Sequence, residues 1–379
     1  MVMKFTHYRP TKIFFGSGGF QQAAELVTSL GKRVLLVTGR KAMKTLGYTG
    51  RLQTDLQGLG AVTSVYDNIS ASPLSREINE GVERFREWKP QVIAALGGGS
   101  VIDAAKAIDL GLTTGEKIEP YLLGERSIST VGIPLVAIPT TAGTGSEVNP
   151  ISLLTDQALE IKKSMRHEGL FPAIAIVDPA LTLSLNREIT LDTGFDVFTH
   201  AVETYVSRAV KNPLVDMYSQ EAIRMVKEYL PRVLENGQDL EARSRMSYAS
   251  MIMGINLANS SACLPHRLQY GVGIKTGTSH GAGLRALYRS WLDKAYEYAA
   301  EKFNRVGQIL SGRRCENKSD FMSAYDSFID SIGAHLTLAD LKITEDDLPW
   351  LVGKVVGGLN NDPAGEAPDI VNRIYRDAL

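Results

Sequence analysis

Apolar positions along the first half of the chain follow two different periods. Short runs rich in β-branched residues and leucine lie at residues 34–38, 61–66, 92–96 and 135–138, each next to a glycine or a proline. Between them, stretches such as residues 75–88 repeat their apolar side chains at helical spacing. Continuous apolar runs of this length indicate buried parallel strands. Strands that alternate with helices predict an α/β domain with a doubly wound parallel sheet.

The second half of the chain has a different pattern, in which long helices replace strands from about residue 186. Residues 213–234 illustrate it: Asn212 is a suitable N-cap, a proline opens the first turn, and Gly237 follows the expected end. We therefore predict an α/β domain over residues 1–185 and an all-α domain over residues 186–379.

Composition agrees with two domains of a globular protein that acts on small molecules. The 379 residues exceed the size of one ordinary core, and 44% apolar with 22% charged residues is typical of globular chains. With 41 basic and 42 acidic residues the net charge is -1, so we expect no nucleic-acid partner. No apolar stretch reaches membrane-spanning length, and the first eleven residues lack the apolar run of a signal peptide. Two cysteines rule out a disulfide framework and favour the cytoplasm.

A glycine triplet follows the third predicted strand. Gly97, Gly98 and Gly99 lead into a helical stretch that runs through Lys106. Backbone N–H groups at such a helix start suit a pyrophosphate, and glycine lets the phosphate approach the backbone. A glycine triplet can also be an ordinary tight turn, but the strand before it and the helix after it favour phosphate binding.

A second loop, residues 138–147, follows the next strand and concentrates hydroxyl groups. Thr140, Thr141, Thr144 and Ser146 would complement anionic oxygens, although a Ser/Thr-rich surface turn is the simpler alternative. Both loops leave the carboxyl ends of strands in one sheet, where open α/β sheets bind ligands.

One carboxylate and three histidines in the second half form a candidate metal site. Asp196 and His200 are four residues apart and so share a helix face. His266 and His280 follow within a hundred residues. Any one of these histidines alone would be read as a core or surface residue, but the set offers the N/O donors that suit Fe(II), Zn(II) or Mn(II).

Short motifs are distributed over the whole chain. They are Lys12–Gly16, Gly97–Lys106, Pro139–Glu147, Asp196-x-x-x-His200-Ala201-x-Glu203, His280–Gly281 and Asn361–Pro363. Together they resemble the iron-containing (group III) alcohol dehydrogenase family, which shares its fold with dehydroquinate synthase. The resemblance extends essentially from end to end.

The resemblance implies a Rossmann-like dinucleotide-binding domain, an all-helical metal domain, and an active site in the cleft between them. It implies iron as the favoured metal, with zinc or manganese as alternatives. It places Asp103 near the nicotinamide and Lys162 at the nicotinamide ribose. It also places a set of loop residues at the phosphates and ribose: Gly97, Gly98, Gly99, Ser100, Thr140, Thr141, Thr144 and Ser146.

The end of the first predicted strand bears on the choice of cofactor. Many NAD-using relatives carry an aspartate there, whereas this chain has Gly39, Arg40 and Lys41. Without a carboxylate and with cations nearby, a 2′-phosphate can be accommodated, so we predict a preference for NADP(H). The alternative is that Arg40 and Lys41 only begin a solvated helix.

The chain departs from the family pattern around two of the metal ligands. Tyr270 takes the place of a second histidine, so either Tyr270 or water would carry the proton, with the usual phenol pKa near 10. The usual Ala-Asn-Ala after His280 is replaced by Ala282-Gly283-Leu284-Arg285. Arg267 could meet an acidic or phosphorylated aldehyde, or could turn away to pair with a surface carboxylate.

These observations predict a metal-dependent alcohol dehydrogenase or aldehyde reductase. It would transfer a hydride between a primary alcohol, or its aldehyde, and NAD(P), with NADP(H) favoured. Three alternatives stay open: a dehydroquinate synthase-like lyase that uses NAD transiently, a hydroxyacid-oxoacid transhydrogenase, and a metal-free binding or sensor protein. We expect a small-molecule substrate, with no nucleic-acid or membrane partner, and leave a homodimer open.

Overall fold

The computed structural model describes residues 4–129 and 132–379, which group into two compact units. The α/β unit comprises Arg9–Thr141 and Gly145–Leu183. The helical unit comprises Ser184–Leu379, Ala142–Thr144 and the N-terminal segment up to Tyr8. Within the described ranges, no helix has both the length and the apolar character that crossing a membrane requires.

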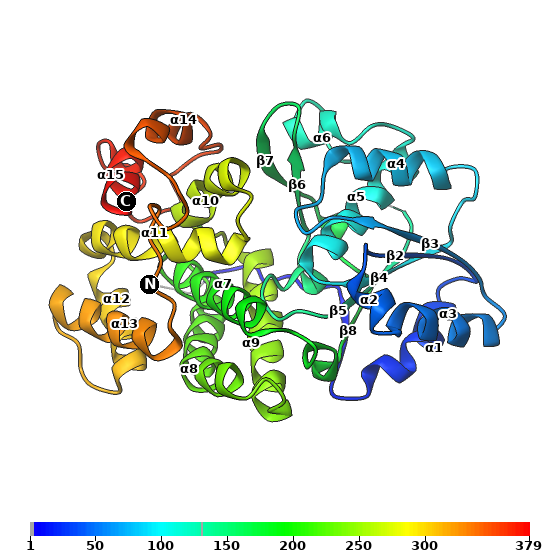
Figure 1. Cartoon of the computed structure of the whole chain (residues 1–379), viewed down its shortest axis with the longest axis horizontal. Coiled ribbons are helices and arrows are strands. Elements are labelled where there is room, and N and C mark those ends of the chain that lie inside the picture. The colour runs from blue at the N-terminus through cyan, green and yellow to red at the C-terminus, as the bar shows by residue number, and fades with distance from the viewer. Residues whose placement is uncertain (1–3, 130–131) are drawn as a thin grey trace. The chain divides into compact units, whose positions relative to one another are not determined.

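A six-stranded sheet forms the centre of the α/β unit. Its strand order is β1-β8-β5-β4-β2-β3, and every neighbouring pair is parallel (Figure 1). The predicted doubly wound parallel sheet is therefore confirmed. The strands are β1 (Lys12–Phe15), β2 (Arg33–Gly39), β3 (Val62–Ile69), β4 (Val92–Gly97), β5 (Leu135–Pro139) and β8 (Ile174–Val177).

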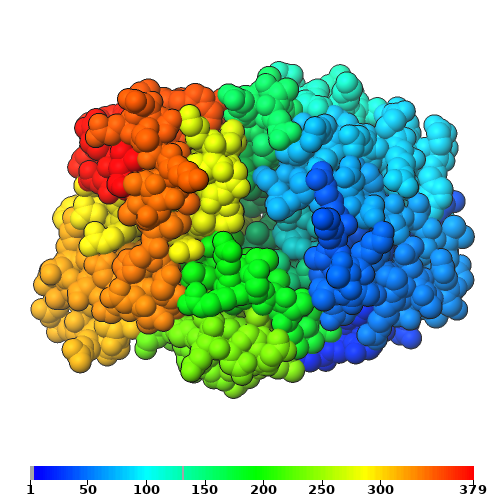
Figure 2. Space-filling view, in the orientation of Figure 1, coloured from blue at the N-terminus to red at the C-terminus, as the bar shows by residue number. Residues whose placement is uncertain are grey.

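Helices pack on both faces of this sheet because the strands are apolar on both sides. On β2, Val34 and Leu36 belong to one buried cluster, and Leu35 and Val37 belong to the other. The first cluster includes residues of η1 (Gly19–Gln22), α1 (Ala23–Thr28), α2 (Ala42–Thr45) and α3 (Tyr48–Gly58). The second includes residues of α4 (Ser75–Phe85), α5 (Gly99–Thr114) and α6 (Glu119–Leu123). In the space-filling view, most atoms of this unit are coloured from blue through cyan (Figure 2).

An antiparallel hairpin follows β5 along the chain, and the apolar pattern did not predict it. Its strands are β6 (Ile151–Asp156) and β7 (Ile161–Arg166), entered through η2 (Ser146–Val148). Two further short turns, η3 (Glu168–Leu170) and η4 (Pro179–Thr182), flank β8.

The helical unit is arranged around α7 (Arg187–Val206), which is buried along most of its length. It packs against α8 (Pro213–Glu235), α9 (Leu240–Asn259) and α11 (His280–Ala295). The side chain of Asn212 accepts a hydrogen bond from the Leu214 N–H, as its position in the sequence predicts. The remaining elements are α10 (Leu264–Thr276), η5 (Tyr296–Tyr298), α12 (Ala300–Ser311), α13 (Lys318–Ile332), η6 (Glu345–Asp347), α14 (Leu348–Gly353) and α15 (Ile370–Asp377).

Asp109, in the middle of α5, is a buried acid whose surroundings only partly compensate for the loss of water. Its carboxylate accepts hydrogen bonds from the Ile133 N–H at 3.0 Å and from Thr113 Oγ1 at 3.1 Å. Burial nevertheless raises the pKa of Asp109 to about 7. The folded state therefore holds this proton more tightly than the unfolded chain, and ionising the group costs stability.

This cost predicts how the variant Asp109→Asn will behave. Because the folded pKa lies above the unfolded one, the cost is absent below about pH 4, grows as the pH rises, and is complete above about pH 7. The variant has no carboxyl group to ionise at this position. The difference in the free energy of unfolding between the variant and the wild type should therefore shift by roughly 2–4 kcal/mol in favour of the variant as the pH rises from 4 to 8. Urea unfolding at several pH values measures this difference; a difference that is constant with pH would contradict the assignment.

Candidate metal centre and cofactor loops

The predicted metal ligands come from three helices of the helical unit. Asp196 and His200 lie one turn apart on α7, His266 lies in the first turn of α10, and His280 is the first residue of α11. A proline in the first turn of α10 costs no hydrogen bond there. The structure thus brings together four residues that are up to 84 positions apart in the sequence.

The four side chains converge on one oxygen atom. From Asp196 Oδ1, the distances are 3.7 Å to His200 Nε2, 3.4 Å to His266 Nε2 and 3.6 Å to His280 Nε2. Ligand atoms that share a tetrahedral cation at about 2.1 Å would be about 3.4 Å apart. The donor atoms of Asp196, His200 and His266 also lie within 4.8 Å of one another, so the spacing of these three fits a first-row divalent metal, and His280 Nε2 approaches the group from the Asp196 side.

Burial makes the cluster unfavourable without a cation. Asp196, His200 and His266 are buried, and Asp196 Oδ1 and His266 Nε2 make no hydrogen bond within the described residues. Leaving buried polar atoms without a hydrogen-bond partner is costly. The His280 side chain is 23% exposed, so the cluster is most accessible on that side.

The ionisation of the ligands also suits a metal. Burial alone would raise the pKa of Asp196, but the neighbouring imidazoles, His200 foremost, hold it below its usual range. Burial lowers the pKa of His200 to about 4, with the charge of Asp196 acting in the opposite direction. The site therefore offers an ionised carboxylate and a neutral imidazole at neutral pH, which are the forms that bind metals.

Glu203, buried one helical turn beyond His200, orients His266. Both carboxylate oxygens lie 2.9 Å from His266 Nδ1, and Oε2 also accepts the Cys263 N–H at 2.6 Å. Burial would lower the pKa of His266, but Glu203 raises it to about 10, so a cation would displace a proton here. The sequence reasoning assigned Glu203 no role, although its helical spacing from Asp196 and His200 was a usable signal.

Gln269 plays the equivalent part for His280. It is fully buried, and its Oε1 lies 2.5 Å from His280 Nδ1, which leaves Nε2 directed at Asp196. A Cβ at Gly283 would lie 2.6 Å from Gln269 Cγ. The glycine at 283 is therefore what makes room for Gln269, which explains one of the departures from the family pattern.

The start of α11 is fixed against α7 by a second set of contacts. Ser279 caps the helix, accepting the Ala282 N–H and donating to Asp192 Oδ2. Arg285 pairs with the other oxygen of Asp192 at 3.0 Å. A Cβ at Gly281 would lie 2.4 Å from the Asp192 carbonyl oxygen, so only glycine permits this approach. These contacts hold His280 in place.

Two further residues beside the ligands were singled out from the sequence. The Tyr270 ring lies near parallel to the His280 ring, with 6.5 Å between the centroids. Arg267 donates a hydrogen bond from Nη1 to the Gly358 carbonyl oxygen. Tyr270 therefore stacks on the candidate metal ligand His280, whereas Arg267 is bonded to the backbone of the segment at Gly358.

The start of the second predicted phosphate loop lies beside the glycine loop in the α/β unit. The Thr140 N–H donates to the Gly97 carbonyl oxygen at 3.0 Å, and a Cβ at Gly98 would lie 3.0 Å from Thr141 Oγ1. Gly98 caps α5 and Gly99 begins it, as expected for a loop whose N–H groups point to a ligand. Ser100 Oγ instead donates to the Ala71 carbonyl oxygen. Thr144 groups with the helical unit.

Asp103 and Ser146, one from each predicted loop region, are hydrogen-bonded to each other. Ser146 Oγ donates to Asp103 Oδ1, and the Leu153 N–H donates to Asp103 Oδ2 at 3.0 Å. The Asp103 carboxylate is therefore hydrogen-bonded inside the unit, and the position near the nicotinamide that the resemblance implies stays a prediction. Lys162 lies on β7, opposite Thr155.

Gly39 and Arg40 lie at the carboxyl end of β2, where the ribose was expected. A side chain at Gly39 would meet only ordinary contacts, the nearest being the Ile69 carbonyl oxygen at 3.7 Å. Arg40 is half exposed and pairs at 2.7 Å with the buried carboxylate of Glu77. Glu77 in turn accepts hydrogen bonds from the backbone N–H groups of Ser70 and Leu74. Arg40 is thus anchored rather than free.

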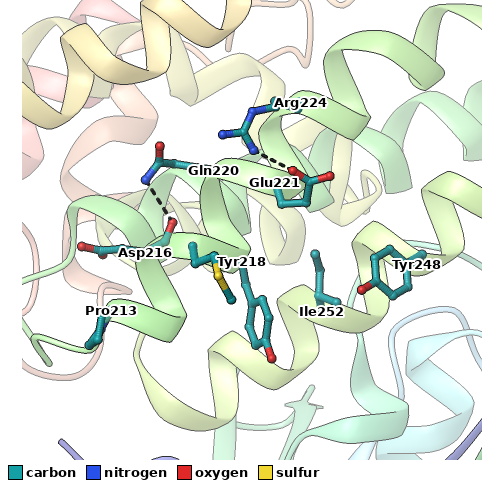
Figure 3. Close-up of a pocket in the computed structure, with 9 residues that line it drawn as sticks. Pro213, Asp216, Tyr218, Gln220, Glu221, Arg224, Tyr248 and Ile252 are labelled. Atoms are coloured by element: carbon teal, nitrogen blue, oxygen red, sulfur yellow. Dashed lines mark hydrogen bonds and ion pairs between the residues drawn. The ribbon is translucent and has the colours of Figure 1, made fainter.

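A groove of about 550 Å³ on the helical unit contains none of these residues. It lies between α8 and α9, and two of its charged residues, Arg224 and Glu221, pair with each other at 2.6 Å (Figure 3). It therefore does not take part in the candidate site.

Comparison with known proteins gives matches over nearly the whole chain. A family model for iron-containing alcohol dehydrogenase matches residues 10–179, and one for the C-terminal part of that family matches residues 190–379. An NAD-dependent methanol dehydrogenase of Bacillus methanolicus is 31% identical, with 72% of this chain and 71% of the relative covered. An NADPH-dependent butanol dehydrogenase of Clostridium saccharobutylicum is also 31% identical, with 82% and 78% covered.

Solved structures agree with these matches. An alcohol dehydrogenase of a halo-thermophilic archaeon from a Red Sea brine pool superposes with a TM-score of 0.94 at 27% identity, covering 100% of both chains.

The contact between Gln269 and His280 predicts a loss of metal affinity in the variant Gln269→Leu. Removing the acceptor frees the His280 ring to rotate, so the dissociation constant of a divalent metal should rise by about 10- to 100-fold. Competition with a chelator measures this constant. Gln220→Leu, on α8 outside the cluster, is the control and should leave it unchanged; equal affinity in the two variants would refute the role of Gln269.

Proposed function

Because the chain belongs to the iron-containing alcohol dehydrogenase family, we propose that it is a metal-dependent, nicotinamide-linked alcohol dehydrogenase or aldehyde reductase. The resemblance in the sequence motifs is confirmed by the two family matches. The observation that carries the proposal is the convergence of three histidine Nε2 atoms on the buried Asp196 carboxylate at 3.4 to 3.7 Å.

Each part of the chain has a defined task in this proposal. Asp196, His200, His266 and His280 hold the cation, which we propose to be Fe(II), with zinc or manganese as alternatives. When bound, the cation supplies Lewis-acid stabilisation of an alkoxide, and the nicotinamide supplies hydride transfer. Glu203 and Gln269 fix the ring orientation of His266 and His280. Rigid orientation of the reacting groups supplies much of the rate.

The glycine loop and the hydroxyl-rich loop would bind the cofactor. The helix start at Gly99 suits the pyrophosphate, and Thr140 and Thr141 lie beside it. We assign Ser100, Thr144 and Lys162 to the cofactor on the strength of the family motifs.

Tyr270 is our candidate for carrying the proton between substrate and solvent. It stacks on the accessible ligand His280 and offers a hydroxyl group. We further propose a cytoplasmic setting, in agreement with two unbridged cysteines.

The central test is the variant His280→Ala. We expect it to bind less metal and to lose at least about 10³-fold in turnover, since Lewis-acid stabilisation supplies several kcal/mol. Metal analysis of the purified protein and an aldehyde panel with NADPH and NADH measure both effects. His335→Ala, at an exposed histidine that pairs with Asp330, is the matched control.

Three outcomes would point elsewhere. A fully active His280→Ala variant without metal would refute the proposal. Bound cofactor with no steady change in nicotinamide absorbance would support a lyase that uses NAD transiently. Hydride exchange between a hydroxy acid and an oxo acid without net cofactor turnover would support a transhydrogenase.

We also propose that NADP(H) is preferred over NAD(H). Gly39 offers no carboxylate to the ribose, and Glu77 anchors the Arg40 guanidinium at the end of β2. Such a planar cation can bind a 2′-phosphate through two hydrogen bonds. The relatives are divided, because one is named for NAD and the other for NADPH.

The variants Arg40→Ala and Gly39→Asp test this preference. Each should lower the ratio of kcat/KM for NADPH over NADH by about tenfold or more, the first by removing a charge-assisted hydrogen bond and the second by adding a carboxylate. Lys44→Ala, an exposed cation on the α2 helix that follows Arg40, is the control. A wild-type preference for NADH, or a ratio of kcat/KM that neither variant alters, would contradict the proposed NADP(H) preference.

A further inference from the structure

Lys106 is a fully buried lysine that none of the proposed steps uses. It lies on α5, about two turns after the glycine loop. Its ammonium group donates hydrogen bonds to Ser146 Oγ at 2.9 Å, to the Asn149 carbonyl oxygen at 2.9 Å and to the Ile151 carbonyl oxygen at 2.6 Å. All three acceptors belong to one segment, which begins where the hydroxyl-rich loop ends.

Asp103, one turn earlier on α5, contacts the same segment. Its carboxylate accepts hydrogen bonds from Ser146 Oγ and the Leu153 N–H, and its carbonyl oxygen accepts one from Ser152 Oγ at 2.7 Å. Asp103 Oδ1 is 3.7 Å from the Lys106 ammonium. The two residues therefore form one buried ionic pair that is hydrogen-bonded to several residues of the segment 146–153.

A buried ion pair is a poor device for stability alone. Removing two charges from water costs several kcal/mol per ion, and apolar residues of similar volume often serve as well or better. Burial lowers the pKa of Lys106 to about 8, with the charges of Asp103 and Glu147 acting in the opposite direction. What apolar residues cannot do is direct hydrogen bonds at particular backbone carbonyl groups.

We propose that Lys106 and Asp103 are positioning residues that lock the hydroxyl-rich loop onto the helix bearing the glycine loop, so that the two loops bind one cofactor in a fixed geometry. The inference rests on the proposed use of a nicotinamide cofactor. The loop is held at its start by the Thr140 hydrogen bond to Gly97, and at its end by this pair. Asp103 thus acts through Ser146 and the backbone, without touching the nicotinamide.

The test separates positioning from stability by comparing single and double variants. Lys106→Met leaves Asp103 buried without its cation, and Asp103→Asn leaves the ammonium without its anion, so both single variants should lower the Tm. The double variant removes both charges, and its Tm should recover at least in part. Its dissociation constant for NADPH and NADH should nevertheless stay at least about tenfold above wild type, because the hydrogen bonds to Ser146, Asn149 and Ile151 are gone.

Asp109→Asn is the matched control, since Asp109 is buried on the same helix but bonds to Ile133 and Thr113 instead. It should leave cofactor affinity unchanged. Metal content should equal that of the wild type in every variant. A double variant that regains both its Tm and wild-type cofactor affinity would overturn the inference.

Asn149→Ala covers the case in which the Lys106 variants do not fold. Asn149 bonds to the Gly145 carbonyl oxygen and the Ile151 N–H as well as to Lys106, so the variant loosens the segment without leaving a charge unpaired. Wild-type cofactor affinity in Asn149→Ala would then reject the inference. Failure of the proposed function looks different, because the wild-type protein itself would bind neither NADPH nor NADH.

Discussion

The burial of the Asp196 carboxylate is the constraint on which the helical unit depends. A carboxylate out of water needs compensating charge or hydrogen bonds, and Asp196 Oδ1 has imidazole nitrogens around it but no hydrogen bond within the described residues. To supply those nitrogens, the first turns of α10 and α11 must both approach α7. The close contact of Gly281 with Asp192 and the fit of Gly283 around Gln269 follow from this approach.

The α/β unit solves a related problem with the opposite charge. Its buried cation, Lys106, is compensated by Asp103 and by backbone carbonyl groups rather than by a ligand. In both units the buried charge connects separate segments. Asp196 connects α7 with α10 and α11, and Lys106 connects α5 with residues 146–151. Without a cation, Asp196 Oδ1 and His266 Nε2 have no hydrogen-bond partner within the described residues, whereas the Lys106 ammonium is hydrogen-bonded to groups of the chain itself. We therefore interpret the first group as a binding site and the second as a structural contact that positions a loop.

Much of the fold was predictable because its signals are local. The strands β2 and β4 show as apolar runs bounded by glycine, and the start of α8 shows in Asn212 and the proline that follows. The hairpin of β6 and β7 was missed because its strands are partly exposed and carry charges such as Lys163. Asp196 and His200 were found because helical spacing is visible in a sequence, and the family motifs then supported His266 and His280.

The residues that sequence reasoning missed act through partners on other elements of the fold. Gln269 matters because His280 folds back against it, and Lys106 because residues 146–151 return to α5. The amino-acid sequence next to Gln269 or Lys106 does not indicate which residue each will contact. The hydrogen bonds of Asp103 with Leu153 and Ser146, and of Ser100 with the Ala71 carbonyl oxygen, were not foreseen for the same reason, and the assignment of both residues to the cofactor stays a prediction.

The departures from the family pattern therefore divide into two kinds. Gly283 and Arg285 have partners inside the helical unit: the first makes room for Gln269, and the second pairs with Asp192 behind the start of α11. Neither change needs a different substrate to explain it. Arg267 is bonded to the Gly358 carbonyl oxygen, so it too has a use in the fold. Tyr270, stacked beside the most exposed of the four ligands, is left as the departure that bears most directly on the chemistry, and the question it raises concerns the path of the proton more than the identity of the alcohol.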